Sequence, residues 1–341
     1  MAKITHNAEL GCYNSFGVEA RADRLVEWES ADDLTEVLAA TPDIIGGRWE
    51  PLGAGNNTLF RGDFHGTLLH CSKGGIRVTD ECSEWVDVRA EAGELWDNIV
   101  DWSVGRGLWG AENLSLIPSS AAASAVQNIG AYGAEARDTI LSVEMIDVAT
   151  LKRVVLANEY CAFGYRDSVF KHTLRGRVVI TAVNYRFHKT AQPKLGYGTL
   201  RTEVEKLGGP TVENIRTAVS AIRRAKLPDP KVTGNAGSFF TNPVTERRVA
   251  EQMRQQWPDM PLYDVPHEPD KVKLAAGWLI EQAGWKGYRG ATVGVHQFQA
   301  LVLVNLGGAT GDEVVALAER IANDVKSKFA VDITPEVNII Q

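Results

Sequence analysis

The stretch RRAKLPDPKVTGNAGSFFTNP, residues 223–243, carries the most specific pattern in the chain. Two glycines three residues apart permit backbone turns that are closed to most other residues. Ser238 follows them directly, and the two phenylalanines after it can anchor the loop in a core. This order predicts a rigid base that presents the Ser238 hydroxyl to a ligand. An ordinary ordered loop is the alternative interpretation.

Basic residues gather around this loop, although the chain as a whole is acidic. The formal net charge is −7 at pH 7, which argues against nucleic acid or an anionic membrane as a partner, since both need a basic surface. Arg223, Arg224, Lys226 and Lys231 could instead form a local pocket for an anionic small molecule. A solvated helix end is the alternative, because cations also favour helix C-termini.

Length and composition limit the class of protein. A chain of 341 residues predicts two or three domains. No apolar run approaches the roughly 18 residues of a membrane span, and the N-terminus lacks an apolar signal core, so we expect a cytoplasmic protein. Cys12, Cys71, Cys82 and Cys161 lack metal-ligand spacing. We therefore expect reduced thiols, with neither disulfides nor a metal site.

Apolar spacing and end signals predict the main helices and strands. Strands are expected at 24–28, 85–90, 141–148, 177–187 and 301–305, and helices at 95–105, 213–227 and 272–284. Further helices should begin at Ser30 and Thr310, which have N-capping patterns. The helix at 272–284 would bury Leu274, Trp278 and Ile280. Residues 188–199 are polar and contain proline and glycine, which indicates a linker.

A glycine-rich loop lies near the N-terminus, at Leu52-Gly53-Ala54-Gly55-Asn56-Asn57. Small residues followed by amides form a loop whose N–H groups can face phosphate oxygens. The loop lacks the Lys-Ser/Thr of a P-loop, and it does not match the Gly-x-Gly-x-x-Gly fingerprint. Taken alone, it is a weak indication of phosphate binding.

Three further blocks carry polar side chains in glycine-rich or proline-bounded settings. QNIGAYG, at 127–133, offers two amides, two glycines and Tyr132, which suits a polar ring system and a diphosphate; a packing role is the alternative for Tyr132. GYRDS, at 164–168, offers Arg166, whose planar fork can bind a carboxylate. A salt bridge from Arg166 to a nearby acid is the structural alternative. Glu336 stands between a proline and an apolar strand.

These blocks, in this order, resemble the UDP-N-acetylenolpyruvoylglucosamine reductase (MurB) family of flavoenzymes, which act in peptidoglycan synthesis. The resemblance covers nearly the whole chain and implies an α+β fold. Residues 1–190 would form a two-lobed FAD domain of the vanillyl-alcohol-oxidase (PCMH) type. Residues 191–206 would form a linker with the tyrosine loop of the family's longer subtype, and residues 207–341 a substrate domain. A monomer is expected.

The resemblance also implies the reaction and its residues. FAD would carry a hydride from NADPH to the enolpyruvyl group of a UDP-sugar, giving UDP-N-acetylmuramate, with no metal. Ser238 would be the general acid, while Arg166 and Glu336 stabilise the enolate. The implied substrate contacts are Tyr197, Lys226, Asn242 and Gln299. The implied FAD contacts are Leu52, Gly53, Ala54, Gly55, Asn56, Asn57, Pro118, Ser119, Ser120, Ser124, Gln127, Asn128, Gly130, Ala131, Tyr132, Gly133, Arg166 and Arg223.

One block departs from the family pattern. The family has Pro-Gly-x-x-Gly where this chain has Pro118-Ser119-Ser120-Ala121-Ala122. We expect Ser119 and Ala122 to be strained in a left-handed conformation, or the turn to open, and either would weaken FAD binding. Glycine at both positions should then tighten it. Two alternative functions follow: another FAD-dependent oxidase of the same fold, or a nucleotide-sugar-binding paralogue with weakened flavin binding.

Overall fold

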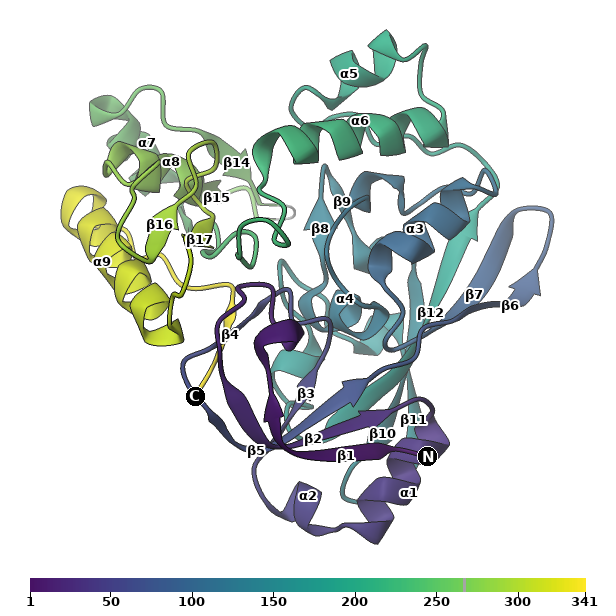
Figure 1. Ribbon diagram of the computed structural model, residues 1–341. Helices are drawn as coiled ribbons and strands as arrows, with labels where there is room; N and C mark the ends of the chain where they lie inside the picture. The colour runs from purple at the N-terminus through teal and green to yellow at the C-terminus, as the bar shows by residue number, and fades with distance from the viewer. Residues whose placement is uncertain (266–267) are drawn as a thin grey trace. The chain divides into compact units, whose positions relative to one another are not determined.

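The computed structural model describes residues 1–265 and 268–341 (Figure 1). The chain divides into two compact units, each built from separated segments. Unit 1 consists of Met1–Ala8, Ala22–Gly55 and His65–Ala225. Unit 2 consists of Glu9–Arg21, Asn56–Phe64 and Lys226–Gln341.

Unit 1 contains two larger sheets, with helices packed on them, and a third sheet of two short strands. Its strands are β1 (Lys3–Glu9), β2 (Arg21–Trp28), β3 (Trp49–Leu52), β5 (Phe64–Cys71), β6 (Ile76–Glu81), β7 (Trp85–Glu91), β8 (Gly130–Ala131), β9 (Ala134–Glu135), β10 (Ile140–Asp147), β11 (Lys152–Ala157) and β12 (Val178–His188). Its helices are α1 (Ala31–Ala40), α2 (Asp43–Gly46), α3 (Trp96–Val104), α4 (Ala121–Gln127), α5 (Leu200–Lys206) and α6 (Val212–Lys226). Short 3-10 turns are η2 (Glu112–Leu114), η3 (Ala136–Asp138), η4 (Asn158–Tyr160) and η5 (Val169–Lys171).

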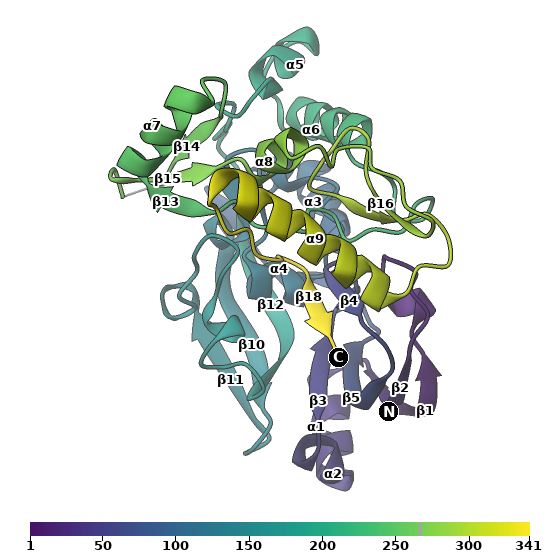
Figure 2. The same ribbon diagram turned by 90° about the vertical axis from the view of Figure 1, so that its left-hand side faces the viewer.

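The two larger sheets of unit 1 form the two lobes that the fold class implies. The first has the order β1-β2-β5-β3, with β3 and β5 parallel. The second has the order β11-β10-β12-β7-β6, and its neighbouring strands are antiparallel. Strand β12 is central, so Val183 lies opposite both Val143 and Ala90. Figure 2 shows β10, β11 and β12 side by side.

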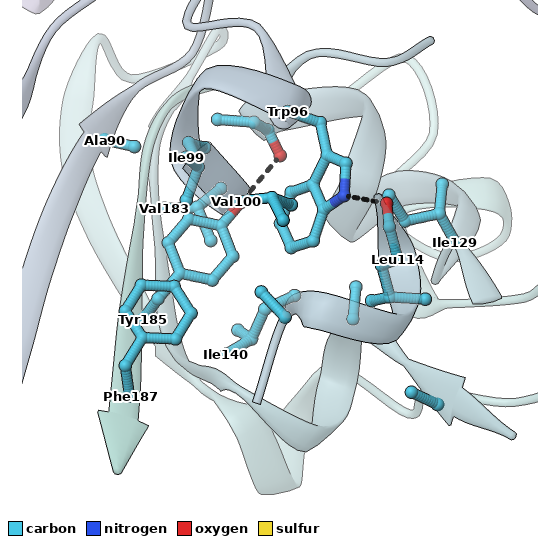
Figure 3. Close-up of a cluster of buried hydrophobic side chains, with 14 of the residues drawn as sticks. Ala90, Trp96, Ile99, Val100, Leu114, Ile129, Ile140, Val183, Tyr185 and Phe187 are labelled. Atoms are coloured by element: carbon cyan, nitrogen blue, oxygen red, sulfur yellow. Dashed lines mark hydrogen bonds between the residues drawn. The ribbon is translucent and has the colours of Figure 1, made fainter. Parts of the chain in front are cut away.

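A large core lies between the five-stranded sheet and helices α3, α4, α5 and α6 (Figure 3). Tyr185 and Phe187 stack in it with ring centroids 6.1 Å apart. The indole of Trp96 is fully buried, and its Nε1 donates to the Leu114 carbonyl at 2.9 Å (Figure 3). Burying these rings removes a large apolar area from water and fixes α3 and α4 on the sheet. A smaller core of unit 1 joins α1 and α2 to β2 and β5.

The described residues of unit 2 form three small sheets and three α-helices. Its elements are η1 (Gly11–Tyr13), β4 (Thr58–Phe60), β13 (Val244–Glu246), α7 (Arg247–Gln256), β14 (Leu262–Asp264), β15 (Lys271–Leu274), α8 (Ala276–Gln282), β16 (Val293–Val295), β17 (Leu303–Asn305), α9 (Gly311–Phe329) and β18 (Asn338–Ile340). The strand orders are β13-β15-β14, β16-β17 and β18-β4, the last pair being parallel. Helix α9 packs on β16, β17 and α8 (Figure 1).

The capping signals read from the sequence are confirmed. The Ser30 hydroxyl accepts from the Asp33 amide at 3.1 Å and begins α1. Thr310 and Glu313 form a capping box at the start of α9. The expected strands at 24–28, 85–90, 141–148 and 177–187 are present as β2, β7, β10 and β12, and the helices at 95–105 and 213–227 as α3 and α6.

The predicted helix at 272–284 is wrong in its first part. Val272 and Leu274 belong to strand β15, and only Ala276–Gln282 is helical. The two apolar residues alternate with lysines, and both are buried, which is the period of a strand. Trp278 is only partly buried, and Leu279 is in the core in its place. The predicted strand at 301–305 is shorter, with β17 beginning at Leu303.

The compact units and the predicted binding domains divide the chain at different places. Helix α6 belongs to unit 1 up to Ala225, and its Ile215 and Val219 are buried in the large core. The expected linker at 191–206 ends in helix α5. Which ranges bind FAD and which bind substrate stays a prediction.

Two whole-chain expectations can be compared with the structure. Over the described residues, no helix is both long enough and apolar enough to cross a membrane. All four cysteines are free thiols, of which Cys71 and Cys161 are buried. Burial raises the pKa of Cys161 to about 11, so this thiol is neutral and unreactive at pH 7.

Candidate active site

The QNIGAYG segment leaves helix α4 through a left-handed residue, Asn128, at φ 42°. The Asn128 side chain is fully buried. Its Nδ2 donates to the Gly164 carbonyl at 2.7 Å, and its Oδ1 accepts from the Arg137 amide at 3.0 Å. Asparagine suits this position because it tolerates the left-handed region better than most residues. The amide that we expected to contact the cofactor therefore joins this segment to the GYRDS turn.

Arg166 occupies a tight turn whose backbone is strained. The turn is closed by hydrogen bonds from Gly164 N to Asp167 O at 2.9 Å and from Asp167 N to Gly164 O at 3.3 Å. Arg166 has φ +55°, which is unusual for a residue with a long side chain. Its Nη2 donates to the Gly130 carbonyl at 2.6 Å. Asp167, a salt-bridge partner considered from the sequence, pairs instead with His172 at 2.8 Å.

A side chain at position 130 would displace the guanidinium of Arg166 from its present place. A Cβ at Gly130 would lie 2.9 Å from Arg166 Nη1 and 3.1 Å from the Ala134 carbonyl oxygen. Contacts below about 3.0 Å force a neighbour to move. Because Gly130 has no side chain, the Arg166 guanidinium can lie against the backbone of the QNIGAYG segment and donate to the Gly130 carbonyl.

Arg223, on helix α6, is a largely desolvated cation that forms no salt bridge with the described residues. Its Nε is buried and has no hydrogen-bond partner within the described part of the chain. Burial is the main cause of its lowered pKa; Tyr132 and Asp97 act to raise this pKa, and the positive charge of Arg166 acts to lower it. A desolvated cation beside a second cation is costly unless an anion binds there. This arrangement indicates an anionic ligand at Tyr132, Arg166 and Arg223.

Tyr132 and Tyr197 meet edge to face in unit 1. Their ring centroids are 5.7 Å apart, with the planes at 79°. Tyr132 has φ 48°, and burial raises the pKa of its hydroxyl, which stays protonated at pH 7. Tyr197 is half exposed, and Gly198 beside it has φ +55°. The predicted tyrosine loop therefore lies next to the predicted FAD motif.

The expected left-handed strain at Ser119 and Ala122 is absent, so that branch of the prediction is wrong, while the expected effect on FAD binding stays a prediction. Neither residue has positive φ; the left-handed residue of this region is Leu116, at φ 57°. Ser120 is the N-cap of α4, and Ala122 lies in the first helical turn. Because the chain here is an ordinary helix start, no glycine is needed.

The first-turn amides of α4 all have partners in the protein. Ala121 N donates to Glu94 O at 2.8 Å, Ala122 N to Ala92 O at 3.2 Å, and Ala123 N to Ser120 Oγ at 3.3 Å. These amides are therefore not available to a diphosphate. Farther along α4, Ser124 is fully buried and shares a hydrogen bond of 2.8 Å with the Tyr185 hydroxyl, which indicates a packing role.

The glycine-rich loop follows β3 and crosses from unit 1 into unit 2 after Gly55. A Cβ at Gly53 would lie 3.2 Å from Ser120 Oγ, so this loop runs close to the start of α4. Gly55 has φ +68°. In unit 2, Asn57 Nδ2 donates to the Glu336 carbonyl at 3.2 Å. The loop thus runs beside two of the predicted site segments.

In unit 2, backbone pairing brings Ser238 close to Glu336. Ser238 forms a bridge with Val302 on one side. On the other side, the Glu336 amide donates to the carbonyl of Phe239 at 2.7 Å. Phe239 and Phe240 are fully buried, as the sequence suggested. Among the residues that the structure describes, none hydrogen-bonds to the partly exposed Ser238 hydroxyl.

The predicted substrate residues of unit 2 have mixed surroundings. Asn242 Oδ1 accepts from the Ala276 amide at 3.0 Å, so its side chain also caps α8. Gln299 is partly buried, with its Oε1 3.5 Å from the Leu301 amide. Lys226 is exposed at the end of α6.

Two side chains near these motifs, Lys171 and Asn113, were missed in the sequence. Lys171 Nζ donates to the Arg166 carbonyl at 2.8 Å and to Gln127 Oε1 at 3.1 Å. Asn113 Nδ2 donates to the Tyr132 carbonyl at 2.7 Å. His296 pairs with Val302 through its amide, and burial lowers the pKa of its ring, so the imidazole is neutral at pH 7. Lys171 follows the GYRDS block and Asn113 precedes the Pro118 block, and this nearness in the sequence could have suggested both as site residues.

Comparison with known proteins places the chain in a family. The model of the C-terminal domain of UDP-N-acetylenolpyruvoylglucosamine reductase matches residues 229–340, and an FAD binding domain model matches residues 22–154. UDP-N-acetylenolpyruvoylglucosamine reductase of Bacteroides fragilis is 44% identical over 328 residues, covering 96% of this chain and 97% of the relative. The protein of the same name from Pseudomonas aeruginosa is 44% identical over 342 residues, covering 99% of each chain. This chain belongs to the UDP-N-acetylenolpyruvoylglucosamine reductase family.

A solved structure agrees with this family at the level of the fold. The reductase of Thermus caldophilus superposes with a TM-score of 0.66 at 21% identity, covering 100% of this chain and 99% of that one. The α+β fold with an FAD domain of the PCMH type is confirmed. Membership of the reductase family favours the reductase over the alternative oxidase and the flavin-poor paralogue.

Proposed function

We infer that this chain catalyses the reaction of its family, the NADPH-dependent reduction of UDP-N-acetylglucosamine enolpyruvate to UDP-N-acetylmuramate with FAD as cofactor. The observation that carries this conclusion is 44% identity to the family's reductases over nearly the full length of both chains. The reaction supplies a precursor of peptidoglycan.

The side chains of unit 1 fit an anionic cofactor such as FAD. The Nε of Arg223 is buried and lacks a hydrogen-bond partner within the described residues, and Arg166 lies near enough to lower the pKa of Arg223. The backbone at Gly130 lies close to the Arg166 side chain, and Tyr132 has a left-handed backbone. Residues 127–133 thus combine hydrogen-bond donors with the Tyr132 ring. We propose that Arg223 and the 127–133 segment hold FAD, with the 52–57 loop beside them. Ser124 and Asn128 support these segments from within the protein.

The chemistry divides between the cofactor and the chain. Bound FAD would supply hydride transfer from NADPH to the vinyl carbon distal to the substrate carboxylate. We propose that Ser238 then donates its proton to the adjacent carbon. Arg166 binds negative charge that develops beside that carbon, since a guanidinium stays charged and donates in pairs. Glu336 would stabilise the same enolate by hydrogen bonding.

Further parts of the proposal concern the substrate contacts, the oligomeric state and the location of the protein. Lys226, Asn242 and Gln299 would contact the nucleotide-sugar. Tyr197 would close over it as the tyrosine loop of the longer subtype, and its glycine neighbours suit a hinge. The edge contact between Tyr197 and Tyr132 supports this placement. We propose a cytoplasmic monomer.

Steady-state assay of the purified protein tests the function. The protein should be yellow, and NADPH oxidation should depend on UDP-N-acetylglucosamine enolpyruvate. UDP-N-acetylglucosamine without the enolpyruvyl group is the matched control and should give no oxidation. NADPH-independent oxygen consumption with an alcohol or a sugar would favour the oxidase instead. A colourless protein that binds the UDP-sugar without turnover would favour the paralogue.

A further inference from the structure

Lys171 contacts both motifs of unit 1 that we assign to the reaction. It ends the 3-10 turn η5, five residues after Arg166. Its Nζ donates to the carbonyl of Arg166 at 2.8 Å and to Oε1 of Gln127 at 3.1 Å. The start of η5 is fixed as well, because the buried Ser168 hydroxyl, at its N-cap, donates to the Val126 carbonyl at 2.6 Å. The ammonium is therefore held where α4 ends and the GYRDS turn begins.

Arg166 needs such support because its backbone is in an unfavourable region. A left-handed conformation costs a non-glycine residue about 1 kcal/mol or more, and Arg166 has φ +55°. A charge-assisted hydrogen bond to the carbonyl of the strained residue itself opposes relaxation of that peptide. The other anchors of the turn are Asn128, which donates to Gly164, and the side chain of Arg166, which donates to Gly130.

The ammonium also fixes which end of Gln127 faces it. An ammonium has three donors and no acceptor, so it can face only the oxygen end of an amide. The donor end of Gln127 is thereby directed elsewhere. Within the described part of the chain, Lys171 pairs with no carboxylate, so its charge adds to that of Arg166 and Arg223.

We propose that Lys171 is a positioning residue for the reaction: it holds Arg166 in the left-handed conformation from which its guanidinium binds the substrate. This inference rests on the proposed function of Arg166. It assigns Lys171 no contact with the substrate, and its effect passes through Arg166.

A double-mutant cycle on the holoenzyme tests this coupling. The parent, Lys171→Met, Arg166→Ala and the double variant are titrated with UDP-N-acetylglucosamine enolpyruvate by calorimetry, without NADPH, so that no turnover occurs. Lys171→Met should weaken binding roughly tenfold, the loss expected for a charge-assisted hydrogen bond. In the Arg166→Ala background the same change should have little effect, because the residue that Lys171 positions is gone. Lys171→Arg should recover most of the affinity.

Controls separate positioning from general stability and from the function itself. Lys152→Met removes an exposed lysine of β11 and should leave affinity unchanged. Melting temperatures of the holoenzymes show whether a loss of affinity reflects unfolding. If Lys171→Met does not fold with FAD, Lys171→Gln replaces it in the same cycle. A parent protein that does not bind the UDP-sugar would contradict the proposed function before any variant is compared.

Two outcomes would overturn the proposal while leaving the function intact. Equal affinity of Lys171→Met and the parent would show that Arg166 holds its conformation without the ammonium. Equal losses in the presence and absence of Arg166 would show that Lys171 acts independently, as a structural or direct binding residue.

Discussion

At the scale of single residues, the chemistry depends on how a serine can act as an acid. A hydroxyl has a very high intrinsic pKa, so it transfers a proton only to a strongly basic carbon or with help from its surroundings. In this protein the serine is Ser238. Its backbone is held on one side by a bridge to Val302, and on the other side the Glu336 amide donates to the carbonyl of the next residue, Phe239. The hydroxyl itself has no partner among the described residues, which leaves it to a ligand. Rigid backbone and unpaired hydroxyl together suit a positioned proton donor.

Ser238→Ala separates this role from a structural one. Flavin reduction by NADPH should remain nearly unchanged, whereas reduction of the enolpyruvyl group should fall by at least about a hundredfold, the usual contribution of a positioned acid. Stopped-flow absorbance follows the two half-reactions separately. Because the backbone hydrogen bonds remain, the melting temperature should change little. Turnover at the parental rate would remove Ser238 as the proton donor, and equal loss of both half-reactions would indicate damage to the fold.

At the scale of elements, helix α4 shows how local sequence and tertiary structure combine. The substitution of two family glycines suggested strain, yet the structure places Ser120 as an N-cap and Ala122 inside the first turn. Serine is a favourable cap and alanine a favourable helical residue, so the local sequence suits the helix start. The partners of the first-turn amides, Glu94 and Ala92, come from a distant segment that no local pattern reveals.

The double variant Ser119→Gly, Ala122→Gly should therefore lose stability without gaining FAD affinity. Glycine in a helix costs about 0.5–1 kcal/mol relative to alanine, and no strain is relieved, because neither residue has positive φ. Thermal melting measures the first effect, and flavin fluorescence during dialysis measures the second. Ser119→Gly alone is the matched control, since it leaves the helix intact. Slower flavin loss from the double variant would show that this turn contacts the cofactor after all.

The 3-10 turn η2 contains a carboxyl group whose burial should make stability depend on pH. Glu112 is 2% exposed, and its Oε2 accepts from the Gly110 amide at 2.7 Å. Burial raises the pKa of this carboxyl above the ordinary value of 4.5. The folded state then binds the proton more tightly than the unfolded state. Its stabilising contribution is complete below about pH 4.5 and is lost as pH rises through the folded-state pKa.

Glu112→Gln should remove this loss, because the amide keeps an acceptor for Gly110 and carries no charge. Melting temperatures are compared for the parent and the variant from pH 4.5 upward. The variant should become increasingly more stable than the parent as pH rises, until the difference reaches a constant value. The exposed Glu159→Gln serves as control and should show no such trend. A difference independent of pH would mean that Glu112 titrates alike in the folded and unfolded chain.

Local patterns predicted several of the longer elements, but they missed others, among them β1, β5, β11 and α7, and placed some boundaries wrongly. Ser30 and Thr310 marked helix starts correctly because capping depends on residues three positions apart. Residues 272–284 were misread because a short apolar run fits both a strand and a helix, and pairing with β13 and β14 decides between them. The candidate site was predicted as separate motifs. The bond between Glu336 and Phe239, like that between Lys171 and Gln127, arises from tertiary pairing that the sequence does not display.

At the scale of the whole molecule, the proposed FAD and substrate residues fall largely in different compact units. Tyr132, Arg166 and most of the proposed FAD residues belong to unit 1, whereas Ser238, Asn242 and Glu336 belong to unit 2. A ligand that binds the folded state reduces local opening of the segments that it contacts, and amide hydrogen exchange reports this. The two ligands should therefore protect different parts of the chain.

Hydrogen exchange with mass spectrometry can test this division. FAD added to the apoprotein should slow exchange in residues 127–133 and 164–168. UDP-N-acetylglucosamine enolpyruvate, added to the oxidised holoenzyme, should extend protection to residues 234–242 and 334–337, because the backbone of these segments carries the proposed acid and carboxyl group. Residues 76–81, in the exposed edge strand β6, serve as the internal control and should be unchanged. If FAD alone protects only unit 2, the cofactor residues are misassigned. If the UDP-sugar protects neither unit-2 segment, then Ser238 and Glu336 do not act on it, because a substrate bound at these residues must restrict the backbone that carries them.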